Sequence, residues 1–185
     1  KTSIADLLML NPYTGWFIKT YILLYILTPV LNAFVENTNR QVYEKVLFFY
    51  FVFIFLLGWF KDITGYMMGG YSISMFVGLY LLARYVRVYS PSWSRFSKKK
   101  DLFIYLLATT ATFLGIYIPV YFGLLHSETF VQAFTRYSSP FVVLGALFLL
   151  LMFSKFNIGV KFGINTVAKS CFAVYLLHFM WGLLP

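Results

Sequence analysis

The sequence predicts an all-α protein, a polytopic transmembrane helical bundle with about six spans in a single domain covering residues 1–185. Of the 185 residues, 61% are hydrophobic, 22% are aromatic and only 11% are charged. A typical soluble domain is about 45–50% apolar and about 25% charged. The apolar residues also form long runs, each near the roughly 17–25 residues that cross a bilayer core. Lipid can cover such an apolar excess, whereas one soluble core of this size cannot.

Six apolar segments are the expected spans, and their boundaries follow from charged and turn-forming residues. Pro29 stands near the end of the first segment, and Gly69 and Gly70 precede the third. The fourth contains no charged residue, and the polar linker at 90–101 before it is the clearest loop. The segments cover residues 13–34, 42–60, 71–88, 102–121, 137–153 and 166–184.

Lysine and arginine placement predicts the orientation, because these residues favour the cytoplasmic side of short loops. Placing the linker at 90–101 in the cytoplasm, and alternating from there, puts eleven basic residues inside and both chain ends outside. The inner set is Arg40, Lys45, Arg84, Arg87, Arg95, Lys98, Lys99, Lys100, Lys155, Lys161 and Lys169. The outer set is Lys1, Lys19, Lys61 and Arg136. The net charge of +9 therefore orients helices, and we expect no nucleic-acid partner.

Ionisable residues inside a span are costly, so they mark functional candidates. His178, in the last segment, is either a proton carrier in a water-accessible cavity or a histidine satisfied by a neighbouring helix. Lys19 either contacts an anionic substrate or extends to the outer interface. The single cysteine, Cys171, has no partner for a disulfide within the chain, and no Cys/His cluster predicts a metal site.

Arg84 and Arg87 stand three residues apart, so they share one face at the predicted cytoplasmic end of the third segment. Guanidinium groups suit phosphates, so this pair is a candidate site for an anionic cofactor. The alternative is that both residues only control topology, as basic residues at helix ends commonly do.

Three segments resemble one family when taken in order. Residues 16–32 (WFIKTYILLYILTPVLN) resemble a "WF…LN" helix of the bacterial membrane-bound acyltransferase 3 family. Residues 70–85 end in GLYLLARY, similar to a second family segment, and residues 170–178 (SCFAVYLLH) resemble a third. Each string alone is unspecific, but their order and spacing over nearly the whole chain predict membership.

The resemblance implies an integral acyltransferase of the bacterial inner membrane, with about ten spans. Such enzymes pass an acetyl or other acyl group from a coenzyme A thioester to cell-surface or exported carbohydrate or glycolipid. It also implies that this chain is the C-terminal half, whose partners are the bilayer and the missing N-terminal helices. The family's hallmark histidine and arginine lie in those helices, so we expect this segment alone to be inactive.

Within that resemblance, His178 matches the terminal "YLLH" histidine and is the catalytic candidate of this chain. Arg84 matches the "LARY" arginine and, with Arg87, is a candidate for holding coenzyme A phosphates. Lys19 and Tyr175 are candidates for the substrate cavity. The alternative function is a multi-spanning transporter or flippase subunit for lipid-linked sugars, although no pair of matching segments suggests the repeats of a transporter.

Overall fold

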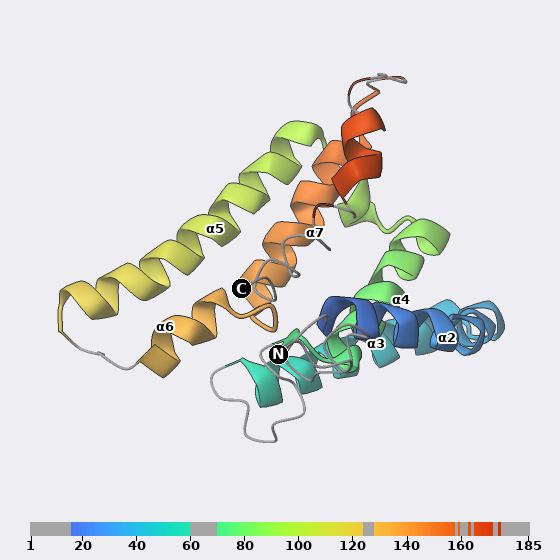
Figure 1. Ribbon diagram of the computed structural model, residues 1–185, viewed down its shortest axis with the longest axis horizontal. Helices are drawn as coiled ribbons and strands as arrows, with labels where there is room; N and C mark the ends of the chain where they lie inside the picture. Colours follow the sequence, from blue (N-terminus) through green and yellow to red (C-terminus); the bar gives the residue numbers. More distant parts are fainter. Residues whose placement is uncertain are drawn as a thin grey trace, which may run out of the picture. The chain divides into compact units, whose positions relative to one another are not determined.

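The computed structural model describes residues 16–59, 70–123 and 128–157, with parts of 159–174, and these residues form helices joined by short connections (Figure 1). The helices are α2 (Trp16–Asn37), α3 (Arg40–Gly58), α4 (Ile73–Tyr89), the 3₁₀ helix η2 (Ser92–Arg95), α5 (Lys98–Tyr121), α6 (Glu128–Thr135) and α7 (Pro140–Ser154). Within the described part there is no strand, which confirms the predicted all-α class.

The chain divides into two compact units, and the larger one, Thr20–Lys155, contains almost all of the named helices. The smaller unit joins Lys1–Lys19 to Phe156–Pro185. Of this smaller unit, the structure describes the first turn of α2 and a helical run at 165–171 whose side chains are exposed. The helix packing of the larger unit involves α2, α3, α4, α5 and α7.

Four helical stretches are long and apolar enough to span a bilayer: Trp16–Asn37, Arg40–Gly58, Lys98–Tyr121 and Ala133–Ser154. They agree with the first, second, fourth and fifth predicted spans. The third predicted span is α4, whose 17 residues are at the lower limit for crossing. Of the sixth, only its beginning lies among the described residues, and it is helical there.

Local signals set the helix ends around the predicted loop at 90–101. Ser90 ends α4 in the left-handed region, with φ 41°, and Pro91 follows where a helix cannot continue. Ser97 then caps α5, its hydroxyl accepting from the backbone N–H of Lys100 at 3.4 Å. The linker is therefore a short, structured connection containing η2.

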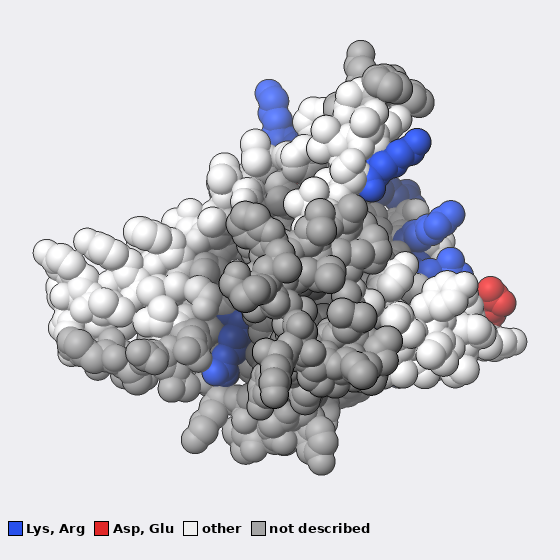
Figure 2. All heavy atoms as spheres, in the orientation of Figure 1, with Lys and Arg blue, Asp and Glu red and all other residues white. Residues whose placement is uncertain are grey.

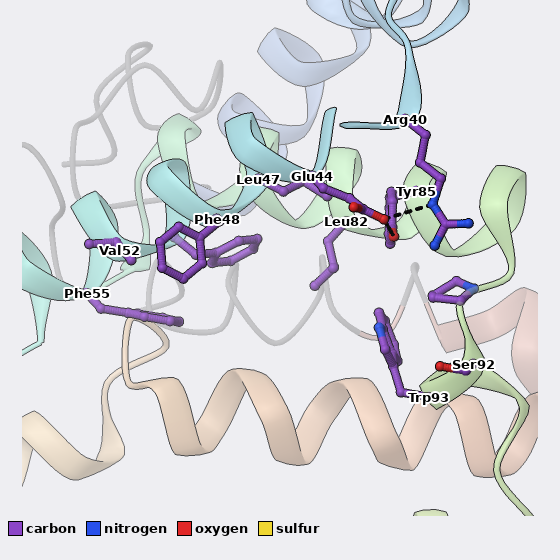
Figure 3. A pocket seen from close by; sticks show the side chains of 12 residues that line it. Arg40, Glu44, Leu47, Phe48, Val52, Phe55, Leu82, Tyr85, Ser92 and Trp93 are labelled. Atoms are coloured by element: carbon purple, nitrogen blue, oxygen red, sulfur yellow. Dashed lines mark hydrogen bonds and ion pairs between the residues drawn. The ribbon is translucent and has the colours of Figure 1, made fainter. Parts of the chain in front are cut away.

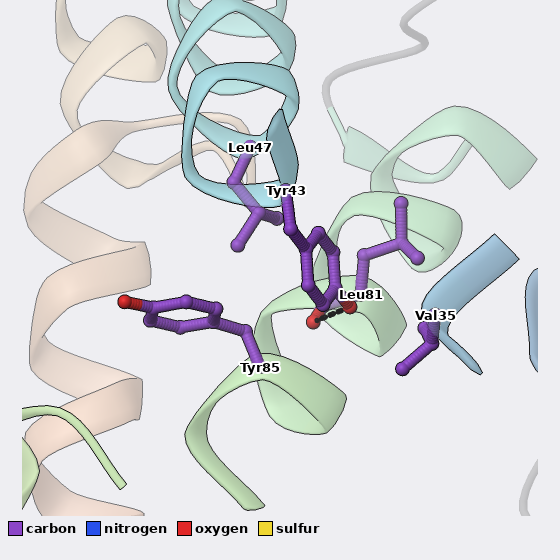
Figure 4. Close-up of a cluster of buried hydrophobic side chains, with 5 residues drawn as sticks. All are labelled: Val35, Tyr43, Leu47, Leu81 and Tyr85. Carbon is purple, nitrogen blue, oxygen red and sulfur yellow. Dashed lines mark hydrogen bonds between the residues drawn. The ribbon is translucent and has the colours of Figure 1, made fainter. Parts of the chain in front are cut away.

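The helices α2, α3 and α4 form one group in which α3 runs antiparallel to the other two. Near the end of α2, the Thr38 carbonyl accepts from the Tyr89 hydroxyl at 3.3 Å, so α2 and α4 end together. The Tyr43 hydroxyl donates to the Leu81 carbonyl at 2.8 Å within a buried cluster (Figure 4). That cluster consists of Val35, Tyr43, Leu47, Leu81 and Tyr85.

The helices α5 and α7 lie side by side and antiparallel, because the first turn of α5 is bonded to the residue that follows α7 (Figure 1). Only Asp101 and Ala108 of α5 are buried, and apolar residues such as Phe103 and Leu107 are about 60% exposed. Residues 102–121 of α5 contain no basic or acidic side chain, so this long apolar surface suits contact with lipid.

Candidate functional site

The charged side chains gather at one end of the larger unit, where α3 and α5 begin and α2, α4 and α7 end (Figure 2). We call this region the basic end. Nine basic residues and three acidic residues in or near the helix ends give it a net charge of +6. The basic residues are Arg40, Lys45, Arg84, Arg87, Arg95, Lys98, Lys99, Lys100 and Lys155; the acidic residues are Glu36, Glu44 and Asp101.

The two candidate arginines reach the basic end in different environments. Arg84 is partly buried, and its Nε is enclosed with no hydrogen-bond partner among the described residues. Arg87 lies in the last turn of α4 and is exposed, where its charge complements the helix dipole. The spacing therefore brings both guanidinium groups to one end of α4, but only Arg84 is covered by neighbouring side chains.

A pocket of about 800 Å³ opens beside the basic end (Figure 3). Arg40, Glu44 and Tyr85 lie at one end of it, with Ser92 and Trp93 of η2 below them in that view. Apolar side chains extend from there along α3: Leu47, Phe48, Phe51, Val52 and Phe55. The pocket thus joins a polar rim to an apolar wall, and neither Arg84 nor Arg87 lines it.

The rim is held by a small ionic network. Glu44 accepts from the Tyr85 hydroxyl and from Arg40 Nε, the latter at 2.8 Å. The Arg40 guanidinium also lies over the Tyr89 ring, 5.8 Å from its centroid. Because Glu44 compensates Arg40, this exposed pair adds no net charge to the rim.

A second ion pair joins α5 to the end of α7. Lys155 Nζ bonds Asp101 Oδ2 and also donates to the Phe96 carbonyl at 2.8 Å. The Asp101 side chain is fully buried, and its Oδ1 has no hydrogen-bond partner in the described part of the chain. A buried carboxylate of this kind depends strongly on its cation.

The described residues at the opposite end of the larger unit include Arg136 and several polar side chains. The Ser138 hydroxyl is fully buried and donates to the Gly58 carbonyl at 2.6 Å, which connects the start of α7 to the end of α3. The Tyr71 and Tyr137 rings meet edge to face at 5.1 Å.

Comparison with known proteins identifies the chain. A family model described as an acyltransferase domain matches residues 4–184, almost the entire chain. The chain belongs to the acyltransferase 3 family. No match was found among curated proteins or among solved structures. The predicted resemblance is thus confirmed at the level of the family, and the helices and the family together describe a membrane protein with an acyltransferase domain.

The other predicted site residues lie in the smaller unit. Lys19 is in the first turn of α2 and is partly buried. Tyr175 and His178 lie outside the described residues. Cys171 is exposed on a helical turn, and within the described residues no group of His, Cys, Asp and Glu side chains could hold a metal ion.

Sequence reasoning missed the two ionic groups of the basic end. It used Arg40 and Lys155 only as topology markers and gave no role to Glu44 or Asp101. A signal for Asp101 was present, because a carboxylate directly after three lysines and before a long apolar run is unusual in a basic linker. Its partner lies 54 residues away, a separation that no local pattern reports.

Proposed function

We propose that this acyltransferase moves an acetyl or other acyl group from a coenzyme A thioester to a carbohydrate or glycolipid at the cell surface, within a bacterial inner membrane. The observation that carries the proposal is the family match over residues 4–184. The basic end supports the choice of donor, because a net charge of +6 attracts a phosphate-bearing cofactor.

In this proposal a sugar hydroxyl attacks the thioester carbonyl carbon. The new C–O ester bond forms, the C–S bond breaks, and coenzyme A leaves as its thiol with the proton of the hydroxyl. A proton carrier near the outer face is needed for this step, and His178 is the candidate in this chain. Replacing His178 by alanine should abolish transfer while donor binding persists; full transfer by this variant would exclude the role.

Arg84 and Arg87 are the candidates for binding the donor phosphates. Arg84 is partly buried and Arg87 is exposed near the same end of α4, so the two residues add two positive charges to the basic end. Each charge-assisted hydrogen bond lost costs about 1.5–3 kcal/mol, so Arg84→Ala/Arg87→Ala should raise the KM for the donor by about 10-fold or more. Arg136→Ala, at the opposite end, is the matched control.

The experiment uses membranes containing the protein, radiolabelled acetyl-coenzyme A, and extraction of the carbohydrate fraction. Label in that fraction, with a donor KM that rises in the double-arginine variant and not in the Arg136 control, supports the proposal. An unchanged donor KM would exclude the arginine role. Movement of lipid-linked sugars across the vesicle membrane without acylation would contradict the proposed acyl transfer and support the transporter alternative.

A further inference from the structure

We infer that the pocket beside the basic end binds one anionic phospholipid from the leaflet at that end, with its headgroup at the rim and its acyl chains along the apolar walls. This inference rests on the pocket and on the charges around it, and it is independent of the proposed acyl transfer. The lipid is a bound component of the enzyme rather than its donor or acceptor.

The shape of the cavity fits a two-chain lipid. The pocket has a volume of about 800 Å³, within the range of about 300–1,000 Å³ that is usual for small-molecule sites. A second cavity of about 410 Å³ extends toward α7 and shares Phe51, Phe55, Leu82 and Trp93 with the first. Two neighbouring apolar cavities beside one polar rim correspond to two acyl chains below one headgroup.

One wall of the pocket belongs to the exposed apolar surface of α3. Phe48 lines it and is nevertheless 63% exposed, and the next residue, Phe49, is 66% exposed. A wall formed by a lipid-facing helix admits lipid sideways from the membrane, whereas a water-borne ligand would have to cross the headgroup region. Lipid chains are as apolar as the side chains they would replace, so the chains fit the groove but contribute little to selectivity.

Charge selects the headgroup. The rim is flanked by Arg95, whose Nε donates to the Ser90 carbonyl at 2.9 Å, directly before the pocket residues Pro91 and Ser92. Arg95 and Ser92 are exposed, and the three lysines that open α5 follow within a few residues. Lysines in a first turn oppose the helix dipole, so an anion at this place relieves repulsion as well as contributing attraction. A phosphate-bearing anionic headgroup therefore suits this end, and a zwitterionic one does not.

The test measures lipid retained by the whole protein, purified in mild detergent and reconstituted with phosphatidylglycerol or with phosphatidylcholine of the same chain length. Native mass spectrometry counts the bound molecules. Wild-type protein should retain one phosphatidylglycerol and much less phosphatidylcholine. Arg95→Gln should lower phosphatidylglycerol retention about fivefold, since one basic residue near a membrane surface contributes about this factor. Arg136→Gln, at the opposite end, should leave it unchanged.

A matched pair of tryptophan variants tests the groove itself. Val52 lines the pocket, whereas its neighbour Phe53 is 58% exposed and does not line it. Val52→Trp should expel the lipid, and Phe53→Trp should retain it. Equal retention in these two variants, or equal retention of phosphatidylglycerol and phosphatidylcholine by the wild type, would overturn the inference. Stoichiometric displacement of the lipid by a long-chain acyl-coenzyme A would also overturn it, because the pocket would then belong to the donor.

Discussion

Replacing Lys155 with methionine should destabilise the packing of α5 against α7 more than any other single charge removal at the basic end. The ammonium group bonds a carboxylate that has no solvent exposure and also holds the Phe96 carbonyl. Removing one member of a buried pair typically costs about 3–5 kcal/mol, because the remaining charge is left without compensation. Here the remaining charge would be Asp101, which water does not reach.

The converse change, Asp101→Asn, should cost much less. The Lys155 side chain is 23% exposed, so without its partner it can extend its ammonium group toward water. An asparagine amide is neutral and still accepts a hydrogen bond from Lys155. The double variant Asp101→Asn/Lys155→Met should be more stable than Lys155→Met alone, because it contains no isolated buried charge.

Thermal denaturation in detergent, followed by intrinsic tryptophan fluorescence, measures these differences. One kcal/mol corresponds to about 2–4 °C in Tm for a chain of this size, so Lys155→Met should lower the Tm by roughly 10 °C. Lys99→Met is the control, because Lys99 is exposed in the same first turn of α5 as Asp101, and it should shift the Tm by no more than about 2 °C. A Tm for Lys155→Met near that of the control, or a larger loss for Asp101→Asn, would refute the reasoning.

Three other substitutions test contacts elsewhere in the larger unit. Gly70→Ala should lower the unfolding free energy by about 1–3 kcal/mol, because φ is +98° and the new Cβ would lie 2.5 Å from Tyr137 Cβ; a neutral midpoint in a denaturant titration would contradict this. Ser138→Ala should cost about 1–3 kcal/mol by leaving the buried Gly58 carbonyl without its 2.6 Å donor, and proteolysis of the α3 end should speed up. Tyr43→Phe retains the ring but loses the bond to Leu81, so its Tm should fall by only a few degrees, whereas a loss as large as that of Tyr43→Ala would show that the hydroxyl dominates.

The helices themselves were predictable because long apolar runs need no tertiary information to be recognised. The expected segments at 13–34, 42–60 and 102–121 differ from α2, α3 and α5 by two to four residues at most ends. The ends depended on polar residues outside the apolar run, such as the cap Ser97, which a span-length criterion ignores. The short helix α6 was not predicted, because its eight residues are below any span length.

The side-chain environments were not predictable from spacing alone. The i, i+3 separation of Arg84 and Arg87 determines that they lie on the same side of α4, but not how far another helix covers each of them. Tyr80 bonds Asn32 of α2 at 2.7 Å, so α2 lies along the part of α4 that includes Arg84. The burial of that guanidinium thus depends on a contact between residues far apart in the sequence, whereas the exposure of Arg87 follows from its place in the last turn.

Tyrosine hydrogen bonds distinguish the contacts within the α2–α3–α4 group from the contacts between this group and α7. Between helices in a bilayer the hydrophobic effect does not favour one helix partner over lipid, so polar contacts and close packing determine how the helices pair. In the α2–α3–α4 group, Tyr43, Tyr50 and Tyr80 each donate to an adjacent helix at 2.7–2.8 Å. The middle of the groove between this group and α7 is instead lined by interchangeable apolar side chains, such as Leu82 and Leu147. A lipid chain can replace contacts of that second kind without breaking a hydrogen bond, which is why an acyl chain can lie in the cavity toward α7 and not in the tyrosine-linked interface.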